Sequence, residues 1–407
     1  MCSVRRVQCD DVVLVHLQNV MGTVKLIIIL YTLTQLFACS LSQKREAMFA
    51  KLFNARPASA ATSVAQQIVT PTDTDKFRAA LFGLYVADAT AMPVHWMYNL
   101  AQLKRDYGRI TSFVKPKDKF EGSILNLSNT GGGGRGSDQG DIVGSVILHG
   151  KKKYWLRGGN YHYHLGLEAG ENTLEAQLCR VLTQSILETS ASVIPPSPTF
   201  SAPHFTEKYM QFMQTPGTHN DTYASTAHRM FFANVVRGKP PHECADNDGH
   251  NTDAIDALTL TVPVILAYAQ CERSVRNAKV REVILITRRS KAVMPYAEKY
   301  ADILVAGKTA LEFIYLFDLL PIINFLCLFC FYRTFRTVLQ GTSIRAAIDA
   351  SDSDGSIRRM AQSSAPDPMV ACYIDSSFPA MLVFAYRYAD SVEQGILASA
   401  NAGGTRT

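Results

Sequence analysis

The sequence predicts a mainly α-helical protein, because apolar residues recur at helical spacing in several segments. They repeat every three or four residues in residues 174–186 and in residues 77–85, as in helices that bury one face. Residues 206–214 and 222–236 are predicted to form two further helices. Of the 407 residues, 47% are hydrophobic and 19% are charged, which is typical of a globular protein with a large core. We therefore expect an all-α fold.

The best-defined predicted helix follows a polar, glycine-containing turn. Its buried face consists of residues at helical spacing: Leu174, Leu178, Val181, Leu182 and Ile186. Asn172 is a suitable N-cap, and Glu175 three residues later completes a capping-box pattern. Glu171, His162 and His164 lie just ahead of this helix start, and such a group could hold an ion or an anionic ligand. The alternative is a well-capped helix behind a turn.

The other long apolar helix contains one acidic residue. It is predicted to end at Pro93, since the residue before a proline avoids the helical conformation. Its apolar face consists of Phe77, Ala80, Leu81, Leu84 and Tyr85. Asp88 is the only acid in this segment. A buried acid must be hydrogen-bonded or functional, so Asp88 either binds a neighbouring backbone group or takes part in catalysis.

Residues 1–74 differ from the rest of the chain and are predicted to be an N-terminal extension. Residues 26–41 form an apolar run that is too short and too polar for a clear transmembrane helix but compatible with a signal peptide. Residues 54–75 have the Ser, Thr, Ala and Pro content of a linker. We expect one domain over residues 75–407. The nine scattered cysteines predict no disulfide framework and favour a cytoplasmic location over a secretory or membrane-anchored one.

Loops are predicted between the first two helices. The glycine run at residues 130–136 lacks the Lys-Ser/Thr pair of a P-loop and the spacing of a dinucleotide-binding motif. A turning loop is expected there, with contact to a ligand as the alternative. Residues 141–148 and 153–156, joined by a turn at His149 and Gly150, predict a short β-hairpin.

Two polar clusters precede the later helices. His219, Asn220 and Asp221 lie at a loop-to-helix junction, where Asp221 is predicted to cap the helix over residues 222–236. Contact with a ligand is the alternative. Residues 246–253 open a further apolar helix, and their acids do not have the spacing of a calcium loop. Helix capping is therefore expected there too.

Six stretches, taken in order, make the chain resemble the ADP-ribosylglycohydrolase family, and within it the branch of the jellyfish J-type crystallins. They cover most of residues 77–404 and read FRAALFGLYVADATAMPVHW, HYHLGLEAGENTLEAQLCRVL, THNDTYASTAHRMFFANVVRG, GHNTDAIDALTL, ITRRSKAVMPYAEKYADILVA and ACYIDSSFPAMLVFAYRYADSVEQGILASANAGG. The resemblance implies an orthogonal all-α bundle. It also implies that two magnesium ions assist hydrolysis of the bond between ADP-ribose and a protein side chain.

The residues at the family's metal positions are altered. Where the family has Thr-Asp-Asp-Thr, residues 170–173 read Gly-Glu-Asn-Thr, and where it has Gly-Gly-Asp-x-Asp-Thr, residues 403–407 read Gly-Gly-Thr-Arg-Thr. The family's glutamate after Pro-Val aligns with His95. Magnesium prefers carboxylate oxygen, so we expect weak binding of Mg²⁺ or none.

The resemblance nevertheless assigns roles to particular residues. The implied catalytic residues are Glu171, Asp88 and His95, the implied metal ligands are Glu171, Asn172 and Thr173, and the implied substrate contacts are Asn220, Asp221, Gly403 and Gly404. The expected partner is ADP-ribose or an ADP-ribosylated protein. The net charge of +6 comes without a dense Lys/Arg face and does not indicate a nucleic-acid partner.

One segment departs from the family pattern. Residues 307–338 separate two stretches that are continuous in the family, and they are rich in Phe, Leu, Ile and Cys. They form either a membrane hairpin or an extra sequence such as a retained intron. Asp318 and Pro321 favour the second interpretation, because both are awkward in a transmembrane span.

Two functions from different classes follow from these observations. The first is hydrolysis of a glycosidic bond in ADP-ribose or a related ligand, with a weakened magnesium site. The second is a catalytically inactive, crystallin-like protein that binds a ligand or serves structurally. The small number of anionic ligands favours the second function, and the activity of most family members favours the first.

Overall fold

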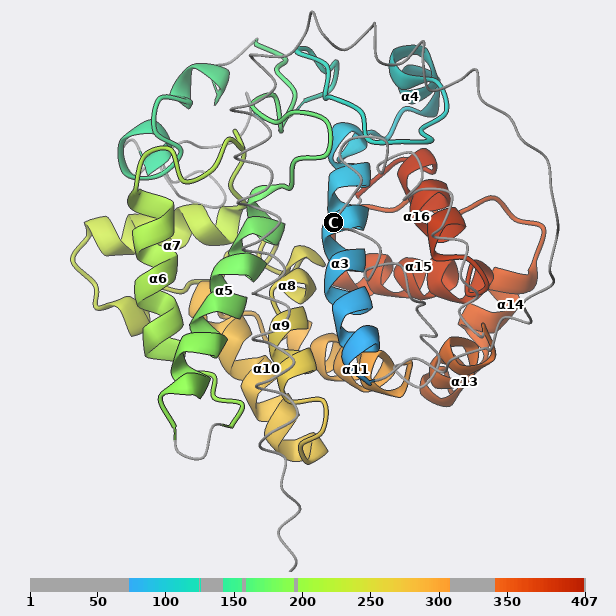
Figure 1. The fold of residues 1–407 in the computed structure, drawn as a ribbon. Coiled ribbons are helices and arrows are strands. Elements are labelled where there is room, and N and C mark those ends of the chain that lie inside the picture. The colour runs from blue at the N-terminus through green and yellow to red at the C-terminus, as the bar shows by residue number, and fades with distance from the viewer. Residues whose placement is uncertain are drawn as a thin grey trace, which may run out of the picture.

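The computed structural model describes residues 73–123, 125, 142–155, 159–193, 197–307 and 341–405, and it consists of helices joined by loops (Figure 1). Within these ranges the β-type pairings are isolated bridges, such as those of Met97 with Gly404 and of Ala254 with Tyr373. The predicted all-α fold is confirmed.

The first half of the described chain contains α3 (Asp73–Ala91), α4 (Leu100–Tyr107), α5 (Leu174–Ala191), α6 (Ala202–Gln214) and α7 (Thr226–Val236). The second half contains α8 (Asp256–Thr259), α9 (Val262–Ala267), α10 (Arg273–Thr287), α11 (Val293–Gly307), α13 (Gly341–Ser351), α14 (Ser356–Gln362), α15 (Ile374–Arg387) and α16 (Val392–Asn401). Short helical turns lie at Met92–Val94, Ile142–Val146, Lys152–Trp155 and Pro241–Glu243.

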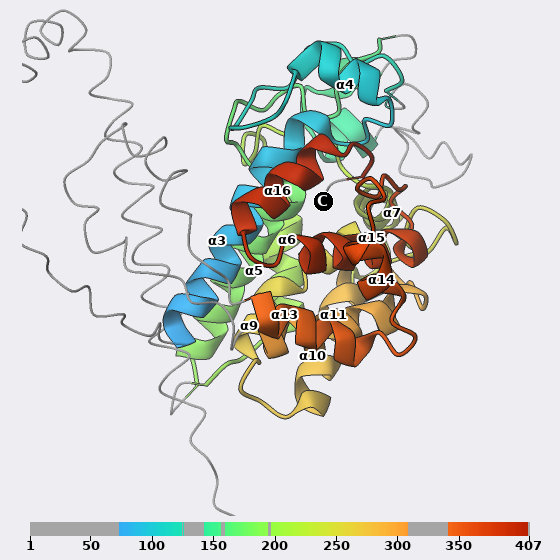
Figure 2. The same ribbon diagram turned by 90° about the vertical axis from the view of Figure 1, so that its right-hand side faces the viewer.

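Helix α3 occupies the middle of the molecule. It contacts α5 and α9 on one side and α16 on the other, and so it joins the green and yellow helices to the red ones (Figures 1 and 2). The α-helix ends at Ala91 and continues as a 3₁₀ turn over Met92–Val94. This change of geometry at Pro93 is the predicted end of the helix, because proline restricts the residue before it.

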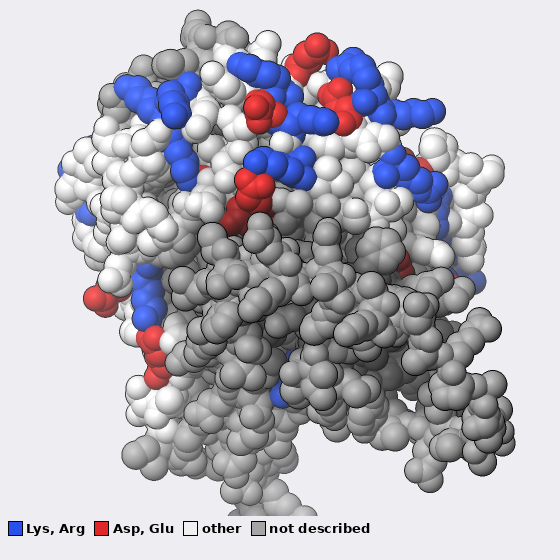
Figure 3. Space-filling model, turned by 45° about the horizontal axis from the view of Figure 1, so that its top comes forward, with Lys and Arg blue, Asp and Glu red and all other residues white. Residues whose placement is uncertain are grey.

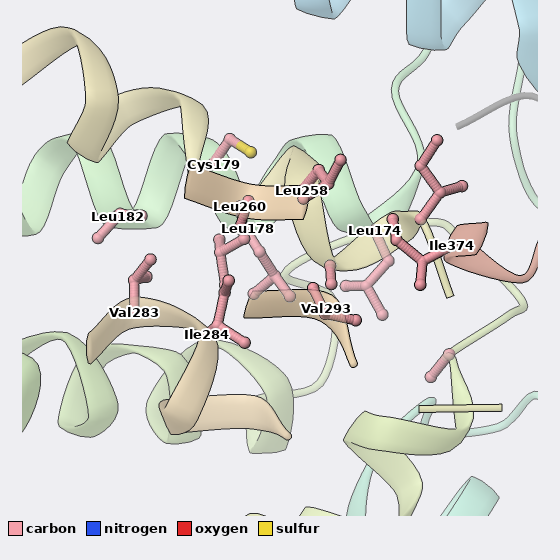
Figure 4. Packing of buried hydrophobic residues seen from close by; sticks show 14 of the residues in the cluster. Leu174, Leu178, Cys179, Leu182, Leu258, Leu260, Val283, Ile284, Val293 and Ile374 are labelled. Carbon is pink, nitrogen blue, oxygen red and sulfur yellow. The ribbon is translucent and has the colours of Figure 1, made fainter. Parts of the chain in front are cut away.

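The core surrounds α5, whose predicted apolar face is buried. Leu174, Leu178, Leu182 and Ile186 are at most 2% exposed, and α5 packs on α6 and α9. Figure 4 shows the apolar side chains of α5 facing Leu258 and residues of later helices. Burial of this stripe holds α5, and therefore its N-terminal turn, in a fixed position.

The predicted β-hairpin at residues 141–156 is wrong. The described part of this segment forms two helical turns, and Gly144 adopts a left-handed φ of +99° that a regular strand does not contain. The backbone N–H of Gly144 donates to the carbonyl of Ile147 at 2.7 Å, which closes a local turn. The indole N–H of Trp155 donates to the carbonyl of Thr222 at 2.9 Å, so contacts with the loop before α7 decide the conformation.

The N-terminal extension before residue 73, the glycine run at 130–136 and nearly all of the 307–338 segment lie outside the described residues. Across the described helices, none combines the length and apolar character needed to cross a bilayer. The face around α4 carries Lys and Arg beside Asp and Glu (Figure 3), including the ion pairs Arg105–Glu121 and Lys115–Glu168.

Candidate functional site

Two carboxylates from other parts of the chain cap the N-terminus of α5. The backbone N–H of Thr173 donates to Asp88 at 2.8 Å, and the backbone N–H of Leu174 donates to Asp221 at 2.7 Å. The first N–H groups of a helix have no partner within the helix, and anionic acceptors suit them best. Thr173 is the N-cap by position, but its own side chain makes no capping bond. The predicted Asn172–Glu175 capping box is therefore wrong, because Asp88 and Asp221, which are distant in sequence, cap the helix instead.

Asp88 binds three groups at the start of α5. Besides the backbone N–H of Thr173, it accepts hydrogen bonds from the Thr173 hydroxyl at 2.6 Å and from the Asn172 amide at 2.9 Å. Burial raises the pKa of Asp88, and these three hydrogen bonds oppose part of that effect. Of the two roles expected for a buried acid, hydrogen bonding or catalysis, the first is observed for Asp88, and its bonds join α3 to α5.

Asp221 also begins a buried chain of two histidines. His164 donates from Nδ1 to the Asp221 carboxylate at 2.8 Å, and its Nε2 lies 2.7 Å from Nδ1 of His95. All three side chains are at most 2% exposed. Burial alone would raise the pKa of Asp221, but His164 and the N–H of Leu174 outweigh it and lower the pKa to about 2. The carboxylate is therefore ionised at neutral pH and fixes the tautomer of His164.

The prediction that Asp221 caps the helix after it is wrong. That helix, α7, begins at Thr226 with Ser225 at its N-cap position. Asp221 lies four residues earlier and serves α5, which is distant in sequence. The loop geometry that brings it there is set by neighbours such as Lys151, whose ammonium donates to the Asp221 carbonyl at 2.6 Å.

His162 stabilises the same region in its neutral form. Its Nε2 donates to the carbonyl of Pro93 at 3.0 Å, and its Nδ1 accepts the backbone N–H of His164 at 3.0 Å. Burial is the main reason that the pKa of His162 falls to about 3. His162 therefore connects the end of α3 to the loop that carries His164.

Glu171 and Asn220 lie at the rim of this cluster. The amide of Asn220 donates to the Glu171 carboxylate at 2.9 Å, and the other carboxylate oxygen accepts the backbone N–H of Glu168 at 2.8 Å. Asn220 is exposed and Glu171 is half-buried. These two predicted site residues are thus in contact, and both are within reach of a ligand.

Trp96 follows His95 and has a strained conformation next to the two histidines. Its φ is +56°, a left-handed value that bulky residues rarely adopt and that is common near functional sites. Its ring stacks on His95 with centroids 4.5 Å apart and meets the edges of Tyr163 and Tyr223 at 4.6 and 4.9 Å. The half-buried indole and its neighbours form an aromatic surface next to the histidine chain.

The C-terminal glycines lie against the loop that carries His95 and Trp96. The N–H of Gly404 donates to the Met97 carbonyl at 2.7 Å. A Cβ at Gly403 would lie 2.7 Å from that carbonyl oxygen, and one at Gly404 would lie 2.8 Å from the Val370 oxygen. Both glycines have left-handed φ values. Their observed role is close backbone packing, next to the predicted substrate side.

The donors at the start of α5 do not fit a pair of magnesium ions. The side-chain amide oxygen (Oδ1) of Asn172 accepts a hydrogen bond from the Arg180 guanidinium, and the Thr173 hydroxyl donates to Asp88. Glu171 is the one remaining carboxylate at the predicted metal position, and it already accepts two hydrogen bonds. Within the described ranges, no cluster of three or more His, Cys, Asp or Glu side chains is arranged to hold a metal.

The second predicted polar cluster forms a loop cap of its own. Asp248 accepts the backbone N–H groups of His250 and Thr252 at 3.1 and 3.0 Å. Ser290 donates its hydroxyl to Asp253 at 2.5 Å. The expected helix capping by this cluster is wrong, because the next helix, α8, has Ile255 at its N-cap position and no side-chain cap. The acids instead bind groups of their own loop and of the loop at Ser290.

The sequence placed His164 in a group that could hold an ion or an anionic ligand, but it did not predict the bonds of His164 to Asp221 and His95. The alternation of His162 and His164 was the available signal, since residues two apart share a side in extended chain. No role was predicted for Arg180 or Trp96. Arg180 reaches Asn172 through the tertiary fold, and the left-handed conformation of Trp96 has no sequence signature.

Comparison with known proteins finds one matching family and similar solved structures. A sequence model of the ADP-ribosylglycohydrolase family matches residues 69–406. A solved structure titled "ADP-ribosylglycohydrolase-related protein complex" aligns with 14% identity over 82% of this chain and 83% of its own, with a TM-score of 0.41. A search of curated proteins found no match. Because the family match spans most of the sequence, the chain belongs to the ADP-ribosylglycohydrolase family.

Proposed function

We propose that this protein binds ADP-ribose, or a protein side chain that carries it, without the family's metal-dependent hydrolysis. The observation that carries the proposal is the position of the Asn172 amide between Asp88 and Arg180. Both ends of this amide are bonded within the protein. The altered residue at a metal position has thus become part of the internal hydrogen-bond network.

The energetics of metal binding support this view. A magnesium ion at this position would have to displace the Arg180 guanidinium from Asn172 and the Thr173 hydroxyl from Asp88. Each displaced group would lose a buried or half-buried hydrogen bond, at about 1–3 kcal/mol each. The positive charge of Arg180 would also repel a divalent cation. The single carboxylate of Glu171 would not neutralise the charge of two such ions.

Ligand binding without metal is supported by the rim of the site. Trp96 is half-buried, and Tyr98 is 45% exposed, with its hydroxyl 3.0 Å from the Thr405 hydroxyl. Aromatic faces of this kind stack on nucleobases, and the stacking depends little on which base is bound. Asn220 and Glu171 add hydrogen-bonding groups suited to ribose hydroxyls. The resemblance to J-type crystallins supports the same non-catalytic class, including a structural role.

A second candidate function is hydrolysis of the glycosidic bond without metal. The Asp221–His164–His95 chain favours it, because a carboxylate that orients a histidine is a common arrangement for general-base catalysis. In this reaction His95 would accept a proton from the attacking water. The bond from ribose C1′ to the side chain would break, and the side chain would leave with a proton.

A thermal-shift titration with ADP-ribose tests the first proposal. We expect ADP-ribose to raise the melting temperature equally in EDTA and in millimolar Mg²⁺, since a ligand that binds only the folded state stabilises it. Trp96→Ala should weaken this binding about tenfold, whereas Tyr98→Phe, which keeps the ring, should leave it within about threefold. The absence of any stabilisation by ADP-ribose would contradict the proposal.

Release of ADP-ribose from an ADP-ribosylated peptide, followed by chromatography, separates the two candidates. We expect no release above the rate without protein. Release in EDTA that is lost in His95→Gln would instead establish the metal-independent hydrolase. Release that requires Mg²⁺ would contradict both candidates.

A further inference from the structure

Two apolar cavities meet beside α3. The larger, of about 440 Å³, lies between residues of α3, α5, α8, α9, α11, α13, α15 and α16, and its walls are mostly aliphatic. The smaller, of about 280 Å³, follows α15 and α16. The lining residues that they share are Ala87, Ile344, Ala385 and Val392. Because protein cores are close-packed, apolar space of this size is typical of a site for a small molecule.

A row of small residues on α3 forms one wall of both cavities. Ala80, Gly83 and Ala87 line the larger cavity, and Ala87 and Ala91 line the smaller one. These residues are three or four positions apart and therefore share one face of the helix, over a length of about 16 Å. A Cβ built at Gly83 would meet no atom within 4 Å, so steric crowding does not account for this glycine. The row leaves an elongated space along α3.

Two hydroxyl groups belong to the wall of the larger cavity. Tyr300 of α11 and Thr259 of α8 both line it, and both are half-buried. Neither hydroxyl forms a hydrogen bond with another residue that the structure describes. Burial raises the pKa of Tyr300 to about 12, so its phenol keeps the proton and can donate it in a hydrogen bond. A buried hydroxyl normally has a partner, and a ligand oxygen would supply one.

The charged groups beside the larger cavity are already bound within the protein. Among its described lining residues, the charged ones are Asp88 and Glu175. Asp88 accepts hydrogen bonds from Thr173 and Asn172. One oxygen of Glu175 lies 3.1 Å from Nε2 of His228. A charged ligand would enter this apolar space without a free counter-ion, which is costly, so the cavity favours an uncharged molecule.

We propose that the joined cavities bind an elongated, uncharged apolar molecule with one hydroxyl or carbonyl oxygen, a long-chain alcohol or ketone, whose oxygen accepts a hydrogen bond from Tyr300. The aliphatic walls hold the chain, and the small residues of α3 leave the room for it. Apolar burial supplies most of the affinity, and the Tyr300 hydroxyl fixes the polar end. The lining residues do not include Trp96 or Asn220, so this site does not depend on the binding of ADP-ribose.

Isothermal titration calorimetry on the full chain with 1-octanol, 2-octanone, octanoate and octylammonium tests the proposal. The four probes have chains of the same length and differ in their polar group. We expect octanol and octanone to bind within about threefold of each other, and the two ions at least about tenfold more weakly. 1-Decanol should bind more tightly than octanol, by about fourfold for each added methylene. Equal or tighter binding of either ion would overturn the proposal, as would a lack of binding by both alcohols.

A matched pair of tyrosine variants tests the hydrogen bond. Tyr300→Phe keeps the ring and removes the hydroxyl, and it should weaken octanol and octanone about fivefold. Tyr296 lies on the same helix, packs against the ring of Phe378 at a centroid distance of 5.3 Å and does not line either cavity. Tyr296→Phe should therefore change the binding of both probes by less than about twofold. Equal effects of the two changes would overturn the role given to Tyr300.

Substitutions on α3 test the position of the site. Gly83→Leu and Ala87→Leu each add a side chain to the wall and should weaken decanol at least about tenfold, whereas Gly83→Ala should leave it within about threefold. Unchanged decanol binding in a folded leucine variant would overturn the proposal. Failure of both leucine variants to fold, measured by circular dichroism, would show that the chain itself fills the space and would also overturn it. ADP-ribose titration of Gly83→Leu should match wild type, because the aromatic rim consists of other residues.

Discussion

The carboxylate of Asp221 lies 2.8 Å from Nδ1 of His164, and both side chains are almost completely buried. This pair joins the loop before α7 to the loop before α5, and the second carboxylate oxygen caps α5 itself. The relationship explains why a polar cluster can be buried here. Asp221 and His164 bind each other, and removal of one of them would leave the other buried without this partner, which is energetically costly.

Asp221→Asn should therefore be strongly destabilising. The change removes the charge that pairs with His164, and we expect a loss of about 3 kcal/mol in the free energy of unfolding, since breaking a buried pair typically costs 3–5 kcal/mol. Urea denaturation followed by circular dichroism measures it. Asp248→Asn is a suitable comparison at a half-buried loop acid, with an expected loss of about 1 kcal/mol. Equal effects of the two changes would contradict the role given to the buried pair.

The same pair predicts part of the acid sensitivity. The pKa of Asp221 is about 2 in the folded protein and about 4 in an unfolded chain. The resulting stability, about 2 kcal/mol, is present above pH 4 and is lost as the pH falls toward 2. In Asp221→Asn, the free energy of unfolding should vary less between pH 4 and pH 2 than in wild type. An unchanged slope in this window would contradict the lowered pKa.

His162 predicts a separate window at higher pH. Its pKa is lowered to about 3 in the folded protein, whereas an unfolded histidine titrates at about 6.5. The unfolded state binds the proton first, so stability is full above pH 6.5 and falls as the pH decreases toward 3. His162→Gln should flatten this dependence, and the exposed His242→Gln should not. The check is the unfolding free energy at half-unit steps of pH from 7 to 4.

The three hydrogen bonds to Asp88 predict a graded series. Thr173→Val removes the hydroxyl that donates at 2.6 Å and should cost about 1–2 kcal/mol. Thr173→Ser keeps the hydroxyl and should cost less than about 1 kcal/mol. In a double-mutant cycle with Asp88→Asn, the effects of Thr173→Val and Asp88→Asn should not add, because the two side chains are in contact. Additive losses would show that the hydroxyl bond does not contribute.

Alanine substitutions at Gly403 and Gly217 separate the energetic cost of steric contact from that of backbone strain. Gly403→Ala places a Cβ 2.7 Å from the Met97 oxygen, while Gly217, with a similar left-handed φ, has open space around it. Both changes should destabilise through strain by roughly 1 kcal/mol. Gly403→Ala should cost at least about 1 kcal/mol more because of the close contact. Equal melting temperatures for the two variants would contradict the close packing.

Local pattern was sufficient to predict much of the fold. The apolar stripe of α5 and the break of α3 at Pro93 follow from periodicity and from proline geometry, and both are observed. The buried role of Asp88 also followed, since an acid in an apolar helix needs donors. In the 141–156 segment, Gly144 and Leu148 adopt left-handed conformations. These conformations depend on tertiary packing, which cannot be inferred from local β-propensity.

The connections of the site could not be predicted, because they join residues far apart in the chain. Asp221 caps a helix that begins 47 residues earlier. The Arg180 guanidinium donates a hydrogen bond to the side-chain oxygen of Asn172. A sequence shows which residues can accept or donate, but the choice among partners depends on the packed helices. For the same reason, the expected cap at Asn172 was wrong while its residue type was compatible with a cap.

Isothermal titration of the wild-type protein with Mg²⁺ directly tests the proposal that Asn172 and Thr173 are bonded within the protein and do not bind a metal. Glu171→Gln is the matched variant, since it keeps the shape and removes the one remaining carboxylate there. We predict no saturable binding at submillimolar Mg²⁺ in either protein, and a melting temperature that Mg²⁺ leaves unchanged. Stoichiometric, submillimolar binding of Mg²⁺ to wild type that is lost in Glu171→Gln would contradict the account.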